Sequence, residues 1–352
     1  MVLKCLALAI FLGFVTASVT SQDLPPAPGR FVNVGGHRMH FACAGAGSLT
    51  VVVENGLGDF STDWSLVQPL VAAFTRICTY DRAGYAWSEP GPMPRTFDQL
   101  NVELHEGLKL LGEHGPFVLV GHSYGGLVIR HYAQIFPDDF SGMVLVETIH
   151  EDQRIPMGPA HAGLIRDDAK GRVIPAPRLA IRPEEKSVKA VPPSTEPLDP
   201  LRAKLSKQNQ LVDSWAAAQP ALEAAENSQK EWSAEYLAVM HNTPQKRILR
   251  NIPLIVLTRA QGGYDDRLGV PGVELEAERL HTQKLPADLS TNSVQLIVPS
   301  GHEMHLEVPE VVASAIHRVV LAVRTHQPLR QFQKLKIVGA RLAQFVQSWR
   351  AP

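Results

Sequence analysis

The chain has 352 residues, 45% of them hydrophobic, and its 34 Lys and Arg residues nearly balance its 35 Asp and Glu residues. This balance argues against a protein that binds nucleic acid through bulk electrostatics, because such proteins carry a basic surface. The apolar fraction excludes a disordered chain, and three cysteines are too few for a dense disulfide scaffold. The length fits one large α/β domain with an insertion, or two average domains.

Residues 1–21 have the pattern of a secretory signal peptide. Lys4 precedes an uncharged apolar run from Cys5 to about Val15, and mostly small residues follow, with cleavage expected after Ser21. The run is shorter than the roughly 20 apolar residues that a membrane span requires. We therefore expect a secreted or periplasmic protein, and an uncleaved N-terminal membrane anchor is the alternative.

Export would leave Cys43 and Cys78 in an oxidising compartment, where disulfides persist. If their segments form neighbouring strands, the two sulfurs could pair. The alternative is two buried thiols that act as small hydrophobic side chains.

Short apolar runs alternate with helical patterns along most of the chain. A hairpin is predicted where Gly35-Gly36 separates two alternating segments. Helical spacing of apolar residues predicts helices over 97–112 and from Gly125 to about Phe136. Apolar strands are predicted at 49–53, 76–80, 116–120, 143–146, 254–257 and 294–298. Strands of this kind, alternating with helices, indicate a mostly parallel sheet with helices on both faces.

The alternation breaks between residues 149 and 250, a stretch rich in Pro and charge up to 200 and helical in pattern afterwards. An insert of this size is too long for a plain loop. We predict a helical cap over 149–250, placed over the carboxyl edge of the sheet. The α/β core is then expected in two parts, 30–148 and 251–323.

Residues 121–125, Gly-His-Ser-Tyr-Gly, follow a predicted strand and open a predicted helix. In this context the G-x-S-x-G pattern is typical of a nucleophile elbow, in which a strained turn exposes the serine hydroxyl. Small flanking residues let the strand and the helix approach each other. Ser123 is therefore the predicted nucleophile, and an ordinary turn serine is the alternative.

A serine hydroxyl needs a base that takes its proton. His302 follows the last predicted strand, on a Gly-containing turn, so it should share the carboxyl edge of the sheet with Ser123. His122 is expected to point away from the serine, and His305 to face the helix. A metal site at His302 and His305 is not predicted, because no HExxH motif and no third ligand accompany them.

The third member of a triad orients the imidazole. Glu147 ends an apolar strand, where an unpartnered carboxylate would be costly to bury. Asp265 and Asp266 follow a later strand in a Gly-rich loop, where turn chemistry is the simpler explanation. Both positions fit the order Ser–acid–His, and we favour Glu147.

Two backbone N–H groups are expected to stabilise the oxyanion. One belongs to Tyr124, the residue after the nucleophile. The other is expected in the loop 55–58 after the strand 49–53, with Leu57 as the donor. A plain turn is the alternative for this loop.

The segments ENGLGDFSTDW, YDRAGYAWSEP, VGHSYGG, VLVET and SGHEMHLEVPE, in this order, resemble the α/β-hydrolase superfamily over roughly residues 30–323. The resemblance implies an eight-stranded sheet and a triad of Ser123, His302 and either Glu147 or one of Asp265 and Asp266. It also implies that the strands bearing Cys43 and Cys78 lie side by side. Asn55-Gly56 stands where many members have His-Gly.

The tail 324–352 is basic, and its apolar residues recur at helical spacing. Such a helix can lie weakly on an anionic membrane surface, or its apolar stripe can pack on the body of the protein. The complete prediction is a secreted serine hydrolase that cleaves a small-molecule ester without a cofactor or metal. Amidase, carbon–carbon hydrolase or haloperoxidase-like activity, and a catalytically silent ligand-binding module, are the alternatives.

Overall fold

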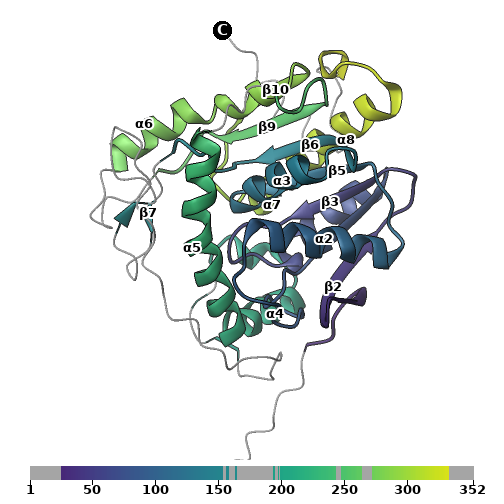
Figure 1. The fold of residues 1–352 in the computed structure, drawn as a ribbon, viewed down its shortest axis with the longest axis vertical. Helices are drawn as coiled ribbons and strands as arrows, with labels where there is room; N and C mark the ends of the chain where they lie inside the picture. The colour runs from purple at the N-terminus through teal and green to yellow at the C-terminus, as the bar shows by residue number, and fades with distance from the viewer. Residues whose placement is uncertain are drawn as a thin grey trace, which may run out of the picture.

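An eight-stranded sheet forms the centre of the molecule, in the order β1-β2-β4-β3-β5-β6-β9-β10 (Figure 1). The computed structural model describes residues 25–153, 156–157, 163–164, 193–194, 197, 199–242, 247–263 and 272–332. The central strands are β1 (Arg30–Val34), β2 (His37–Ala44), β3 (Thr50–Glu54), β4 (Arg76–Tyr80), β5 (Phe117–His122), β6 (Phe140–Val146), β9 (Leu254–Arg259) and β10 (Ser293–Val298). Among these strands, β2 runs in the direction opposite to the other seven, which are parallel to one another. The predicted fold class is thus confirmed.

Helices cover both faces of this sheet. The α-helices are α1 (Gln68–Ala72), α2 (Phe97–Leu111), α3 (Tyr124–Ile135), α4 (Lys207–Ala217), α5 (Pro220–Asn242), α6 (Gly272–Thr282), α7 (Met304–Glu307) and α8 (Pro309–Thr325). The 3-10 helices include η1 (Ser61–Leu66), η3 (Arg202–Lys204), η5 (Leu285–Leu289) and η6 (Leu329–Phe332), and β7 (Pro156–Met157) pairs with β8 (Gly163–Leu164). Local signals fix the ends of α2, where Thr96 caps the first turn and Gly112 takes the left-handed conformation.

The strands are apolar on both sides because each face is covered. Val51 and Val53 of β3 belong to the hydrophobic cluster that includes Ile316 of α8. Val52, between them, belongs to the cluster on the other face, with Leu104 of α2. Successive side chains of a strand point to opposite faces, so an uninterrupted apolar run is what a buried parallel strand requires.

The hairpin of β1 and β2 forms where Gly35-Gly36 predicts it, and β2 then pairs with β4. Cys43 stands directly opposite Cys78 in this pairing, and the two sulfurs form a disulfide. The pairing of the two cysteines is therefore confirmed.

Part of the predicted cap is described as the helices α4 and α5. Trp215 of α4 and Leu222 of α5 pack against Phe60 and Tyr85, which follow β3 and β4. Farther along α5, Leu237 packs with residues of α2 and α3. Figure 1 shows α5 running along the side on which the parallel strands end.

Several predicted segments fall wholly or partly outside the described residues, namely the signal peptide at 1–21, much of 154–198, and the tail from 333 onward. At the start of the tail, Leu329 is buried in the core and Phe332 packs against it. No helix in the described part of the chain is both long enough and apolar enough to cross a bilayer.

Candidate active site

Ser123 occupies a sharp turn between β5 and α3. Its φ of 49° and ψ of −118° are strained for a residue with a side chain, and its amide donates to the carbonyl of Val146 at 3.1 Å. A Cβ atom at Gly125 would overlap the carbonyl oxygens of Glu54 and Asn55. Glycine is therefore required where α3 starts against the end of β3. This is the geometry that the sequence motif predicts for a nucleophile elbow.

Ser123, Glu147 and His302 line the same cavity, which has a volume of about 340 Å³. They come from the ends of β5 and β6 and from the turn after β10. The structure thus brings together three residues that are far apart in the chain. Polar walls of the same cavity are contributed by Arg259, Arg279, Gln283 and Gln153.

His302 keeps an exposed surface while the surrounding protein encloses much of its ring. This enclosure lowers the pKa of His302, and the positive charge of the neighbouring His122 lowers it further. A lowered pKa leaves the imidazole neutral near pH 7 and able to accept a proton. The backbone carbonyl of His302 accepts a hydrogen bond from Nε2 of His122 at 3.1 Å, which ties the histidine turn to the elbow strand.

Glu147 is 3% exposed and contacts two arginines. Its Oε2 accepts from the backbone N–H of Arg259 at 2.7 Å, and its Oε1 lies 3.1 Å from Arg259 Nε and 3.1 Å from Arg279 Nη1. Burial raises the pKa of Glu147, and the contacts with Arg259 and Arg279 oppose that rise. The contacts among the described residues include no hydrogen bond between Glu147 and His302. The alternative acids, Asp265 and Asp266, lie outside the described residues.

The two predicted oxyanion donors lie on neighbouring segments. Tyr124 is the first residue of α3, and Leu57 packs into the apolar cluster that contains the Tyr124 side chain. Within the described part of the chain, neither backbone amide has a protein acceptor. Arg82 holds the loop that carries Leu57, because its guanidinium donates to the carbonyls of Asn55, at 3.1 Å, and Gly56. Neither Leu57 nor Tyr124 is among the residues that line the cavity of Ser123.

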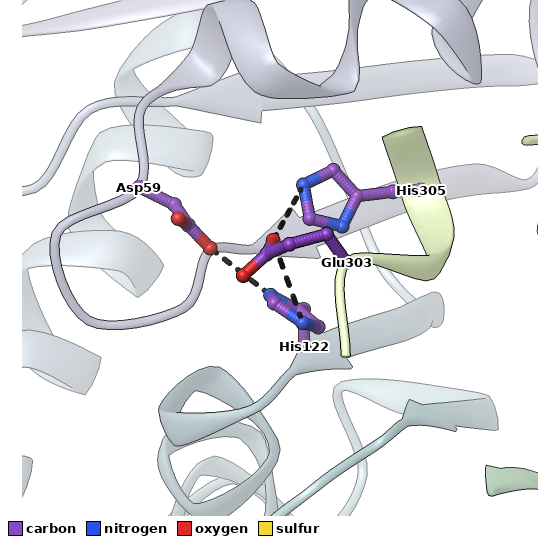
Figure 2. Close-up of side chains that lie close together, drawn as sticks. All are labelled: Asp59, His122, Glu303 and His305. Carbon is purple, nitrogen blue, oxygen red and sulfur yellow. Dashed lines mark hydrogen bonds and ion pairs between the residues drawn. The ribbon is translucent and has the colours of Figure 1, made fainter. Parts of the chain in front are cut away.

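A second polar cluster lies beside the elbow (Figure 2). His122 is buried, and its Nδ1 lies 3.0 Å from Oδ2 of Asp59, in the loop after β3. Burial lowers the pKa of His122, but Glu303 and Asp59 outweigh it and raise the pKa to about 9. Figure 2 shows Glu303 and His305 reaching the same place from the turn after β10 and from α7. The sequence of residues 302–305 alone does not indicate that Glu303 and His305 lie close to Asp59 and His122.

An arginine of the cap extends this cluster. Nη2 of Arg202, in η3, lies 3.1 Å from Oδ1 of Asp59, and its Nε lies 2.6 Å from Oδ2 of Asp213. These contacts join the cap to the loop that carries Leu57. Arg202, Asp59 and the two arginines at Glu147 were not predicted from the sequence. The nearest sequence signal was the cost of burying Glu147 without a partner, which does not identify the partner.

The model of the Alpha/beta hydrolase family matches residues 51–315, and the chain therefore belongs to this family of hydrolases. A solved serine hydrolase involved in carbazole degradation is similar, with a TM-score of 0.56 at 19% identity, covering 83% of this chain and 98% of that chain. A thermophilic esterase from Thermogutta terrifontis gives a TM-score of 0.53 at 18% identity, covering 84% and 98%. At such identities the likeness shows the fold alone.

Curated relatives match shorter stretches. The 2-hydroxy-6-oxo-6-(2'-aminophenyl)hexa-2,4-dienoic acid hydrolase of Metapseudomonas resinovorans is 27% identical over 133 residues, which is 36% of this chain and 46% of that protein. The matches cover between 18% and 48% of the length of the curated relatives.

Proposed function

We propose that the protein is a serine hydrolase that cleaves carboxylic esters through an acyl-enzyme on Ser123. One observation carries the proposal. Ser123 stands in a strained backbone conformation between β5 and α3, and it lines a cavity that His302 also lines. Strain at a position that the surrounding structure fixes is typical of functional sites. The carbazole-pathway serine hydrolase and the esterase share the fold and support the proposal as analogies.

The proposed reaction has two halves. The Ser123 hydroxyl attacks the ester carbonyl while His302 takes the hydroxyl proton, and the amides of Leu57 and Tyr124 hold the oxyanion. The carbon–oxygen bond to the alcohol then breaks, and the alcohol leaves with the proton from His302. Water attacks the acyl-enzyme with His302 as the base, which releases the acid and restores Ser123.

We assign the orienting acid to Glu147. Among the described carboxylates, it is the one that lines the cavity together with Ser123 and His302. The arginine contacts use three of the roughly four lone-pair sites of its carboxylate. Catalytic hydrogen bonds are often long before substrate binds, so the present contacts of Glu147 leave this role open to it.

The cavity volume of about 340 Å³ lies near the lower end for small-molecule sites. We therefore expect short acyl chains to be preferred. A series of p-nitrophenyl esters from acetate to laurate tests both the reaction and the size limit, with Ser123→Ala as the blank. Hydrolysis that falls with chain length and is lost in Ser123→Ala supports the proposal. Hydrolysis that is unchanged in Ser123→Ala contradicts it.

We also propose that the protein is exported. The Cys43–Cys78 disulfide suits an oxidising compartment, and the first 21 residues have the pattern of a signal peptide. Expression of the full chain in a secreting host, followed by N-terminal sequencing of the exported protein, tests this. A mature chain that begins near Gln22 is expected, and retention of Met1 in the cytosol would contradict export.

A further inference from the structure

Four side chains of metal-ligating type converge beside the nucleophile elbow, and none of them is among the residues that line the cavity. We propose that Asp59, His122, Glu303 and His305 bind one divalent transition-metal ion, with Zn²⁺ as the expected occupant. This proposal is independent of the ester hydrolysis proposed above. It differs from the sequence-based expectation of no metal because the loop after β3 and the end of β5 supply ligands that lie far from His305 in the chain.

The donor atoms have the spacing of a compact site. One donor atom from each of the four side chains lies within 4.8 Å of the other three. Nδ1 of His122 lies 3.0 Å from Oδ2 of Asp59, and Nε2 of His305 lies 3.6 Å from Oε2 of Glu303. Tetrahedral zinc with bonds of about 2.0–2.1 Å separates its ligand atoms by about 3.3 Å. Small side-chain rotations would therefore bring all four donors to one ion.

The side chain of His305 points into this cluster, where its Nε2 lies 3.6 Å from Oε2 of Glu303, too far for a hydrogen bond (Figure 2). Its side chain is fully buried, and neither ring nitrogen has a hydrogen-bond partner among the described residues. Its ring stacks on Trp64, with centroids 4.9 Å apart and planes 9° from parallel, which fixes its direction. Glu303 Oε2 also lacks a hydrogen-bond partner there. Leaving buried polar groups unsatisfied destabilises a fold, and a bound ion would satisfy Oε2 of Glu303 and one ring nitrogen of His305.

His122 has the hydrogen bonding of a metal ligand. Its Nε2 donates to the backbone carbonyl of His302, and this is the kind of bond that fixes the tautomer of a ligating histidine. Its Nδ1 then faces Oδ2 of Asp59 at 3.0 Å. Two such acceptors can approach each other only with a positive charge between them, either a proton or a metal ion.

The charges around the cluster are compatible with a divalent cation. Asp59 and Glu303 offer two carboxylates, and both types of donor, imidazole and carboxylate, suit Zn²⁺. Arg202 bonds to Oδ1 of Asp59 at 3.1 Å and so leaves Oδ2 for the site. The ion would join the elbow to the histidine turn, because His122 precedes Ser123 and Glu303 follows His302. We expect the ion to stabilise the fold where the elbow and the histidine turn meet.

The test uses the full-length protein, purified with a chelator and dialysed free of it. Zn²⁺ is added both to the folded protein and during refolding from urea, and the metal retained after gel filtration is measured. Co²⁺ is added in parallel, because its visible absorption reports four-coordinate nitrogen and oxygen ligands. We expect one equivalent of Zn²⁺ per chain, a higher melting temperature and a visible Co²⁺ band.

The variants are His305→Gln and Glu303→Gln, with His317→Gln as the control. His317 lies on α8 and packs against the ring of Phe74 in a tilted arrangement, away from the cluster. Loss of a residue that hydrogen-bonds to a metal ligand lowers metal affinity by about 10–100-fold, so loss of a ligand itself should lower it by more than about 100-fold. If His305→Gln does not fold, as judged by circular dichroism, the Zn²⁺ affinity of Glu303→Gln decides the test. Absence of stoichiometric Zn²⁺ after both treatments, or equal affinity in the cluster variants and His317→Gln, would overturn the proposal.

Discussion

Glu147→Gln separates the two roles that the structure allows for this carboxylate. As the triad acid, Glu147 would orient His302 and stabilise its protonated form. As an ion-pair partner, it neutralises Arg259 and Arg279 in a buried site. The amide of glutamine keeps the shape and one acceptor oxygen but removes the negative charge. Glu147→Gln should therefore lower both the catalytic turnover and the stability of the fold, and the two losses can be measured separately.

The structure sets the expected sizes of the two effects. Glu147 is 3% exposed and makes contacts of 2.7, 3.1 and 3.1 Å with the two arginines. Removing one partner of a buried ion pair costs about 3–5 kcal/mol, and the retained oxygen places this variant near about 3 kcal/mol. For a fold of about 300 residues, 1 kcal/mol corresponds to about 1.6 °C, so the melting temperature should fall by about 5 °C. Loss of a triad carboxylate lowers turnover by roughly 10⁴-fold.

Glu276→Gln is the matched control for the arginine contacts. Glu276 bonds to the same two arginines, at 2.6 Å from Arg259 and 2.5 Å from Arg279, but it is not among the residues that line the cavity. It should lose stability while kcat/KM for a p-nitrophenyl ester, measured well below both melting temperatures, stays near the wild-type value. Equal kcat/KM in Glu147→Gln and Glu276→Gln would refute the catalytic role of Glu147 and leave Asp265→Asn and Asp266→Asn as the next variants.

Three further predictions concern the elbow, the disulfide and the acid response. In Gly125→Ala the added Cβ atom overlaps the end of β3. The variant should therefore lower kcat/KM at least about tenfold and lower the unfolding free energy, measured in urea, by about 1–3 kcal/mol. Wild-type kinetics in this variant would contradict the elbow packing. Replacing Cys43 and Cys78 together by Ala should cost about 4 kcal/mol, since the bridge closes a loop of 35 positions; an unchanged urea midpoint would show that the bridge stabilises nothing. Burial raises the pKa of Glu103, but hydrogen bonds from Arg95 and His37 outweigh it and lower the pKa from 4.5 to about 2. The contribution of Glu103 to stability is therefore present above about pH 4.5 and lost as the pH falls towards 2. The difference in unfolding free energy between wild type and Glu103→Gln should shrink over that range. A constant difference would contradict the lowered pKa of Glu103.

The parts of the fold that follow from local sequence could be predicted. The runs at 49–53, 116–120 and 254–257 are apolar on both faces, and only a strand covered on both sides needs that pattern. The elbow combines a buried strand, a helix pattern and glycines at fixed offsets from Ser123, so its geometry depends on neighbours in the sequence. His302 was found because parallel strands end at one edge of the sheet.

The polar partners around the site could not be predicted in the same way. Arg259 and Arg279 meet Glu147 only because β9 lies beside β6 and α6 returns over the strand ends. Asp59 and Arg202 meet through the placement of the cap, which composition does not define. An isolated Asp or Arg in the sequence usually indicates a solvated surface, so the burial of these charges becomes visible only in three dimensions.

Covalent labelling tests the central claim most directly. The account predicts that a fluorophosphonate adds one phosphonyl group to the wild-type protein, that intact-mass measurement shows a single adduct, and that peptide mapping places it on Ser123. Ser123→Ala should remain unlabelled, and His302→Ala should label far more slowly. A wild-type protein that stays unmodified, or a Ser123→Ala variant that is labelled at the same rate, would contradict the claim that this serine is an activated nucleophile.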